Sequence, residues 1–295
     1  MELWVWITLT AAAVQTIRFM LQKELRATRL STSGATFARF GFGAPLAVLC
    51  MGLVLTRYGV PEVRPGFYAY ALVGGAAQIL GTMATVALFQ MRNFAVGLTF
   101  AKLEVILTAI IGFVVLGDRL SLPIVVAISV GVGGVLALAE VGCAGRPRLW
   151  SHSTLLGLAA GLLLGVSGVC YRGASFEVLS EVPLVRSSIT LAFVTLSQSL
   201  AMAIAMRWRE PGQLTLVFTN WRIASLVGLT SMLGSLGWFT AFTLKSVAEV
   251  KALAQVELIF AALASALWFG ERMTARELIG LVLVGSSVVA LVLVA

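Results

Sequence analysis

The feature that most constrains this chain is a series of long apolar stretches, each the length of a membrane span, that recurs along its 295 residues. A helix needs roughly 20 apolar residues to cross a hydrocarbon core of about 30 Å. Backbone groups in lipid must be satisfied by helices or closed barrels, and the uninterrupted apolar runs exclude a barrel. We therefore predict ten transmembrane helices, at 3–22, 33–55, 67–89, 94–116, 122–140, 154–176, 182–206, 219–243, 247–269 and 275–294.

Composition supports an all-α integral membrane protein with no soluble domain. Hydrophobic residues make up 59% of the chain and charged residues 12%, against about 45–50% and about 25% in soluble domains. The first apolar stretch has no basic region before it and no small-residue cleavage site after it, so we expect a retained helix. The expected location is the bacterial inner membrane, with the lipid bilayer as a partner.

Several function classes find no support in the sequence. The net charge is +8, but Lys and Arg cluster in the loops, as they do for membrane orientation, so we expect no nucleic-acid partner. The three cysteines are widely spaced, and the single histidine, His152, lies in a polar loop. These residues suggest neither a disulfide framework nor a metal site. No nucleotide-binding motif occurs, so we expect no cofactor and no enzyme chemistry.

An internal repeat relates the two halves of the chain at an offset of 153 residues. Without gaps, 75–121 matches 228–274 at 11 of 47 positions. We therefore predict two five-helix repeats, 1–145 and 153–295, and an odd number of spans makes the second repeat inverted. Inverted repeats characterise secondary transporters, whose substrate site lies near the midplane. The matches include Gly81 with Gly234, Glu104 with Glu257, and Gly117-Asp118-Arg119 with Gly270-Glu271-Arg272.

The repeated acidic motifs carry a family resemblance. A glycine and an acid, Gly117-Asp118 and Gly270-Glu271, precede a polar residue and a helix, and another acid, Glu104 or Glu257, stands fourteen residues earlier. This pattern resembles the EamA-type branch of the drug/metabolite transporter superfamily. The resemblance implies a ten-helix carrier, commonly an exporter of amino acids or related small metabolites.

Two features of the pattern bear on the helices and their orientation. The family often places a proline directly after the intramembrane acid, whereas Val105 and Leu258 stand there in this chain, so we expect no proline kink. Basic residues are more frequent after odd-numbered spans, which would place both termini outside, while the resemblance implies termini in the cytoplasm. The orientation therefore stays open, as does the oligomeric state.

Ionisable side chains within the fourth and ninth spans are the first site candidates, because such groups are costly in lipid and by default face a cavity or a partner. Glu104 and Glu257 could carry coupling protons, or they could be structural acids that fix the repeat interface. Lys102, Lys251 and Gln255 could bind a carboxylate or phosphate of the substrate. Lys251 lies close enough to its helix end to snorkel into the headgroups instead.

The third and eighth spans supply a second set of candidate substrate-binding residues. Gln78, Thr82 and Thr85 share one helix face, and their repeat equivalents are Ser231, Ser235 and Trp238. Hydroxyl groups in spans also bond to their own helix carbonyls, and Trp238 could stack on a substrate ring or simply pack. Gln15, deep in the first span, is a further cavity candidate. Arg39 in the second span aligns best with Arg186 in the seventh, at an offset of 147 residues. Both are expected to snorkel or to pair at helix ends.

The sequence thus predicts a secondary active transporter that exports a small metabolite by alternating access, with proton coupling as one option. The alternatives are multidrug efflux or uptake of a metabolite. A membrane-embedded enzyme is disfavoured because the chain lacks a nucleophile–base pair or a metal cluster. A non-transporting scaffold is disfavoured because it would not need repeated polar residues at membrane depth.

Overall fold

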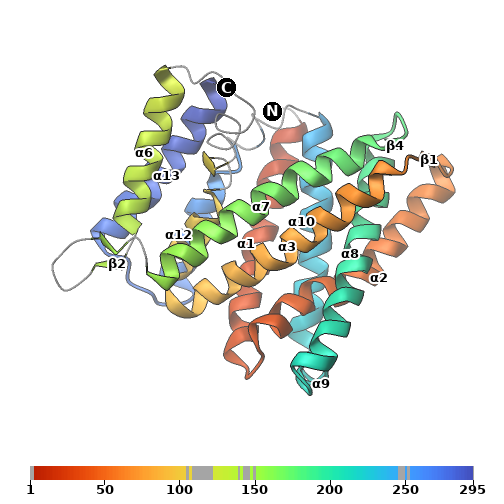
Figure 1. Ribbon diagram of the computed structural model, residues 1–295, viewed down its shortest axis with the longest axis horizontal. Helices are drawn as coiled ribbons and strands as arrows, with labels where there is room; N and C mark the ends of the chain where they lie inside the picture. The colour runs from red at the N-terminus through yellow and green to blue at the C-terminus, as the bar shows by residue number, and fades with distance from the viewer. Residues whose placement is uncertain are drawn as a thin grey trace. The chain divides into compact units, whose positions relative to one another are not determined.

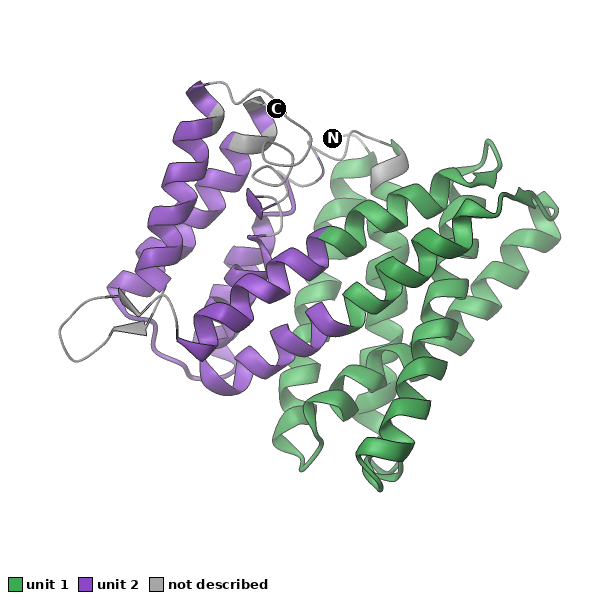
Figure 2. Ribbon diagram, viewed as in Figure 1, with its two compact units in different colours: residues 1–79, 166–245 green, residues 80–165, 246–295 purple. Residues whose placement is uncertain are grey.

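The computed structural model describes residues 3–103, 106–107, 122–138, 140–141, 147–148, 151–244, 250 and 253–294. The chain divides into two compact units (Figure 2). Unit 1 comprises 1–79 and 166–245, and unit 2 comprises 80–165 and 246–295. The division falls inside α3, Gly66–Met91, and inside α7, His152–Phe176, so each of these helices contributes to both units. Each unit therefore combines residues from both halves of the sequence.

Unit 1 is a bundle of long apolar helices (Figure 1). Helix α1 packs along α10, and α2 packs along both α8 and α10. Phe67, Tyr171 and Val194 form part of a core that joins α3, α7 and α8. Apart from its parts of α3 and α7, the unit contains α1 Leu3–Ala27, α2 Thr32–Tyr58, α8 Pro183–Arg209, α9 Gln213–Thr219 and α10 Trp221–Leu244.

Glycines set the closest approach of helices in unit 1. At the contact between α2 and α10, a Cβ added to Gly228 would lie 2.6 Å from the carbonyl carbon of Phe42 and 2.8 Å from the nitrogen of Gly43. A Cβ on Gly237 would lie 2.9 Å from the Cβ of Ala11, where α10 meets α1. Small residues let helix backbones approach closely where lipid supplies no hydrophobic drive for association.

Polar contacts tie the loops together at the ends of unit 1. Glu210, just after α8, accepts hydrogen bonds from the hydroxyls of Ser31 and Ser33 at the start of α2. Strand β1, Glu62–Val63, follows α2 and pairs antiparallel with β4, Val178–Leu179, which follows α7. The loop after the first expected span thus meets the loop after the seventh, and the loop after the second meets the loop after the sixth. This agrees with spans that cross the membrane in alternating directions, because loops after odd-numbered spans then lie on one side and loops after even-numbered spans on the other.

Unit 2 contains α4 Phe94–Ala101, α6 Leu122–Leu138, α12 Val256–Leu267 and α13 Ala275–Val294, and the short strands β2 Glu140–Val141 and β3 Pro147–Arg148 pair antiparallel. Helices α6 and α13 lie side by side (Figure 1). A Cβ on Gly134 would lie 3.0 Å from the carbonyl oxygen of Gly280, and the reverse distance is the same. The Ser287 hydroxyl donates to the Ala127 carbonyl at 2.6 Å, which also ties α13 to α6.

The helices support a multi-pass integral membrane protein. Within the described ranges, six helices are long and apolar enough to cross a membrane, namely α1, α2, α3, α7, α8 and the Trp221–Ala241 part of α10. Together with α6 and α13 they lie where the sequence predicts spans, to within a few residues. The described part of the chain is helical apart from two pairs of two-residue strands in loops, so the all-α prediction is confirmed. Helix α9 and these strand pairs lie between the predicted spans and were not expected. The inverted arrangement of the repeats stays a prediction.

The contact between α2 and α10 allows a test of packing. Gly228→Ala should destabilise the protein by about 1–3 kcal/mol, because the added methyl group meets backbone atoms that cannot rotate away. The control is Gly168→Ala on α7, where an added Cβ meets open space, so it should keep or slightly raise stability. Thermal unfolding in detergent measures both. Equal melting temperatures would show that α2 and α10 do not depend on this close approach.

Candidate functional site

A buried ion pair joins the two helices that carry the predicted intramembrane charges. Lys102 directly follows α4, and Glu257 lies in the first turn of α12. The Lys102 Nζ meets a carboxylate oxygen of Glu257, and the two residues are only 9% and 0% exposed. Removing one partner of such a pair leaves an uncompensated buried charge, which is strongly destabilising. In this conformation, an anionic substrate would have to compete with Glu257 for Lys102.

The backbone tightens beside both members of the pair. The N–H groups of Lys102 and Leu103 donate to carbonyls three residues earlier, at 3.0 and 3.2 Å, and those of Glu257 and Leu258 do the same at 3.1 and 2.9 Å. Such 3₁₀ turns interrupt a regular α-helix. The expectation of unbroken helices at 94–116 and 247–269 is therefore wrong. Both spans are interrupted at nearly equivalent positions of the repeat, without a proline.

Two of the predicted residues on these spans, Glu104 and Lys251, lie outside the described residues. Gln255 is half-buried at the turn that precedes α12. The sequence excluded a local pair between Lys102 and Glu104, because residues two apart point to opposite sides of a helix. The structure gives Lys102 its partner from α12 instead. Periodicity within one span could not have found this pair, because it joins residues 155 positions apart.

The acidic motif at the end of α12 anchors the helix that leads to Lys102. Glu271 accepts a hydrogen bond from the Phe94 N–H at 2.8 Å, at the first turn of α4, and another from the Ser265 hydroxyl at 2.6 Å. A carboxylate at this position accepts from a backbone N–H that has no partner within the helix, and its negative charge lies near the positive end of the helix dipole. The motif acid therefore has a structural role, which the sequence pattern alone did not reveal.

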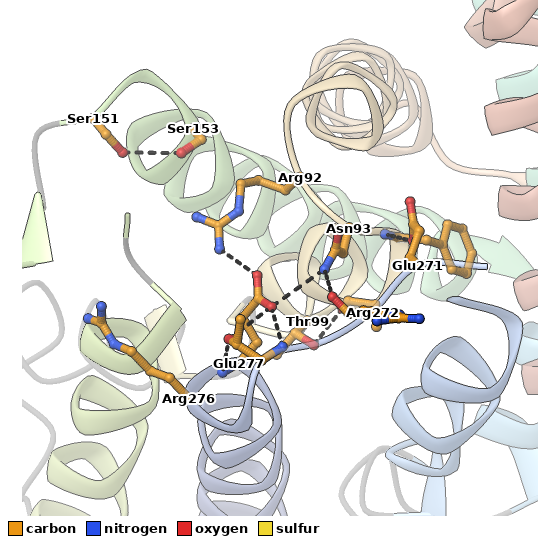
Figure 3. Close-up of polar contacts among 12 residues, drawn as sticks. Arg92, Asn93, Thr99, Ser151, Ser153, Glu271, Arg272, Arg276 and Glu277 are labelled. Atoms are coloured by element: carbon orange, nitrogen blue, oxygen red, sulfur yellow. Dashed lines mark hydrogen bonds and ion pairs between the residues drawn. The ribbon is translucent and has the colours of Figure 1, made fainter. Parts of the chain in front are cut away.

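A second acid joins the same two loops. Glu277, in the first turn of α13, forms an ion pair with Arg92 at 3.1 Å and accepts a hydrogen bond from the Asn93 amide at 3.4 Å (Figure 3). The Asn93 amide also donates to the Arg272 carbonyl at 3.2 Å. The loops after α3 and α12 are thus held together where α4 and α13 begin.

A buried network of amide and hydroxyl groups lies inside unit 1. The Gln198 amide on α8 donates to the Gln78 side chain at 3.0 Å, to the Tyr171 hydroxyl at 3.1 Å and to the Gly75 carbonyl at 2.9 Å. The Tyr171 hydroxyl on α7 donates to the Gln78 side chain at 2.9 Å. This network joins α3, α7 and α8. The other faces of these three helices carry apolar residues that face lipid.

Arg39 extends the polar interior of unit 1. Its Nε donates to the Ser231 hydroxyl on α10 at 3.0 Å, and the residue is only 6% exposed. The expectation that Arg39 snorkels or pairs at a helix end is therefore wrong. Its repeat counterpart, Arg186, does bond at a helix end, to the Ser180 carbonyl before α8.

The remaining candidates divide between the two units. In unit 1, the Trp238 indole donates to the Gln15 side chain at 3.0 Å, and Ser235 is half-buried between Ser231 and Trp238 on α10. Trp238 thus has a hydrogen-bonding role that neither expectation for it included. In unit 2, Thr82 is buried, and the buried Thr85 donates to the carbonyl of Gly81 at 2.9 Å. A bond of this kind, to a carbonyl of its own helix, was the expected alternative to a substrate-binding role for Thr85.

Sequence reasoning missed two members of the unit 1 network. Tyr171 and Gln198 are 5% and 2% exposed, and both donate hydrogen bonds to the Gln78 side chain. The available signal was a polar side chain deep in an apolar span, the same signal that selected Gln15 and Gln78. It was overlooked because neither residue belongs to the part of the chain that repeats clearly. In the described part of the chain, no three His, Cys, Asp or Glu side chains group as metal ligands would.

The ion pair between Lys102 and Glu257 predicts strong coupling in a double-mutant cycle. Lys102→Met and Glu257→Gln should each destabilise the protein by about 3–5 kcal/mol, because each leaves one charge buried without its partner. The double variant should cost clearly less than the sum of the two. Chemical unfolding in detergent measures all four proteins. Additive losses would mean that the two side chains do not interact in the folded protein.

Comparisons with known proteins agree with this architecture. One solved crystal structure, 15% identical, aligns over 97% of this chain and 98% of its own chain with a TM-score of 0.58, which shows a shared fold. No curated protein matches the chain. Residues 153–293 match the model of the EamA-like transporter family. This family is part of the drug/metabolite transporter superfamily, so the resemblance seen in the sequence is confirmed over this stretch, just under half of the chain.

Proposed function

We propose that this protein is a secondary active transporter that exports a small polar metabolite, such as an amino acid or a related compound, by alternating access. The observation that carries the proposal is the buried polar interior of unit 1, where Gln78, Tyr171 and Gln198 bond to one another and Arg39 bonds to Ser231. Polar and charged groups at membrane depth are costly and usually mark a substrate or ion pathway. A scaffold would be more stable with apolar side chains at these positions.

The chemistry of the network suits a metabolite with several polar groups. An arginine presents several fixed donors that match a carboxylate, and glutamine side chains offer both donors and acceptors. Trp238 and Gln15 add an aromatic face and a further amide close to Ser231 along α10 and α1. A multidrug carrier would favour an adaptable aromatic cavity over this set of directed hydrogen bonds. The polar network therefore supports metabolite transport over multidrug efflux.

We place the substrate path between two inverted repeats, 1–145 and 153–295, each with five spans. Three features support this arrangement. The sequence repeats at an offset of 153 residues, and the spans with Lys102 and Glu257 are interrupted at nearly equivalent positions. Within unit 1, α1 packs on α10 while α7 contacts α3 at Gly74, which are equivalent pairings if the halves are related as proposed. Inverted repeats provide two similar states that open to opposite sides.

The ion pair offers a means of coupling to protons. Protonation of Glu257 would remove its attraction for Lys102, which would free the two interrupted helices to separate. Discontinuous helices surround the coupling sites of many transporters built from inverted repeats. Glu104, at the equivalent position of the first repeat, is a second candidate for the same role. The alternative, that both acids only fix the packing of the repeats, predicts transport that is independent of a pH gradient.

Counterflow in proteoliposomes tests the substrate site. Vesicles loaded with a panel of unlabelled amino acids and related metabolites should accumulate the labelled form of the transported compound. Arg39→Gln should lower this exchange by about tenfold or more, because a charged hydrogen bond to the substrate is worth about 1.5–3 kcal/mol. The control is Arg186→Gln, which changes the repeat counterpart at a helix end and should retain exchange. Equal exchange by both variants would exclude Arg39 from the site.

The coupling proposal is tested with a pH gradient and the substrate found in that assay. Wild-type vesicles should accumulate the substrate against its concentration gradient when a pH gradient is imposed. The variant Lys102→Met with Glu257→Gln removes the titratable acid and avoids an uncompensated lysine. It should still exchange substrate but should no longer respond to the gradient. Accumulation at the wild-type level by this variant would show that the pair is structural only.

A further inference from the structure

A groove on unit 1 lies outside the polar interior. It has a volume of about 410 Å³ and runs between α2 and α10. Its α2 wall is one helix face that includes Leu49, Leu53 and Arg57, and Leu229 and Leu233 contribute to the α10 wall. All four leucines are exposed, so the groove opens toward the surroundings of the helices. In a membrane protein, these surroundings are lipid.

The groove begins just beyond the closest contact of the two helices. Gly43 and Gly228 meet there, and Pro45 follows inside α2 before the first lining residue, Leu46. Proline inside a helix removes a backbone hydrogen bond and commonly bends the helix. From Leu46 to Arg57 the helix rises about 16 Å, which is about half of the hydrocarbon thickness of roughly 30 Å. The α2 wall of the groove therefore covers about the depth of one leaflet, while the α10 wall covers about one helical turn, from Leu229 to Leu233.

The far end of the groove is formed by two amphipathic side chains, and its lining is almost entirely apolar. Arg57 and Tyr58 close it in the last turn of α2. Both residues are exposed, and no carboxylate among the described residues forms an ion pair with Arg57. Arginine and tyrosine at the ends of spans lie at the level of the lipid headgroups. An apolar groove whose α2 wall covers the depth of one leaflet, with a cation at the headgroup level, matches one acyl chain joined to a phosphate.

We propose that this groove binds a phospholipid with an anionic headgroup, with one acyl chain between α2 and α10 and the phosphate at Arg57. The lipid would pack against the two helices whose other faces carry Arg39 and Ser231. It would stabilise their contact without taking part in substrate recognition. This site does not depend on the proposed transport activity, because it is defined by binding alone.

Lipid binding tests the proposal directly. Purified protein, delipidated in detergent, is titrated with phosphatidylglycerol or with phosphatidylcholine of the same acyl chains, and bound lipid is counted by native mass spectrometry. We expect tighter binding of phosphatidylglycerol. Arg57→Gln should reduce this preference by about fivefold, the effect of one basic side chain near an anionic headgroup. The control is Arg207→Gln, which removes an exposed arginine at the end of α8 and should leave the preference intact.

The native thiol of Cys50 gives a second measurement, because Cys50 lines the groove and is half-buried. With Cys143 and Cys170 replaced by serine, phosphatidylglycerol should slow alkylation of Cys50, and phosphatidylcholine should slow it less. The proposal is overturned if the two lipids bind equally, if Arg207→Gln and Arg57→Gln have the same effect, or if Cys50 is not protected. It is also overturned if Leu229→Trp leaves the lipid preference unchanged but dissociates a dimer, which would make the groove an interface between two copies.

Discussion

The cost of a polar group in hydrocarbon governs this structure more than any other single effect. Lipid offers no hydrogen bonds, so each buried donor and acceptor must find a partner inside the protein. The chain meets this requirement with specific contacts between helices. Gln198 bonds to three groups on α3 and α7, Arg39 reaches Ser231 on α10, and Lys102 pairs with Glu257. These contacts determine which helices lie together, and they place the candidate site within the bundle.

Much of the fold could be predicted because apolar length is a local property. Spans such as α2 and α8 begin and end within a few residues of the predicted positions, and the repeated acidic motif predicted the family whose model matches residues 153–293. Contacts between distant positions are not local, and no pattern in one span reveals them. The partnership of Lys102 with Glu257 and the burial of Arg39 both depend on which helices meet. The 3₁₀ turns beside Lys102 were missed because a break without proline leaves no residue marker.

The repeat also shows how equivalent residues can diverge. Arg39 and Arg186 match in the sequence, yet one lies in the polar interior and the other caps a helix end. Lys102 aligns with Gln255, so this pair of equivalent positions carries a charge in only one half of the chain. A carrier with two similar halves needs such differences to bind an asymmetric substrate. The proposed site therefore consists of side chains that differ between the two repeats, on helices that both repeats contain.

The proposed alternating-access mechanism requires that the polar interior of unit 1 opens to water on each side of the membrane in turn. Ser235, half-buried on α10 between Ser231 and Trp238, is a suitable reporter. The most direct measurement replaces the three native cysteines, introduces Ser235→Cys and applies a membrane-impermeant thiol reagent to either face of oriented vesicles. Alternating access predicts that the thiol is labelled from both faces and that the extent of labelling from each face changes when the transported substrate is added. Labelling from neither face, or from one face under all conditions, would contradict it.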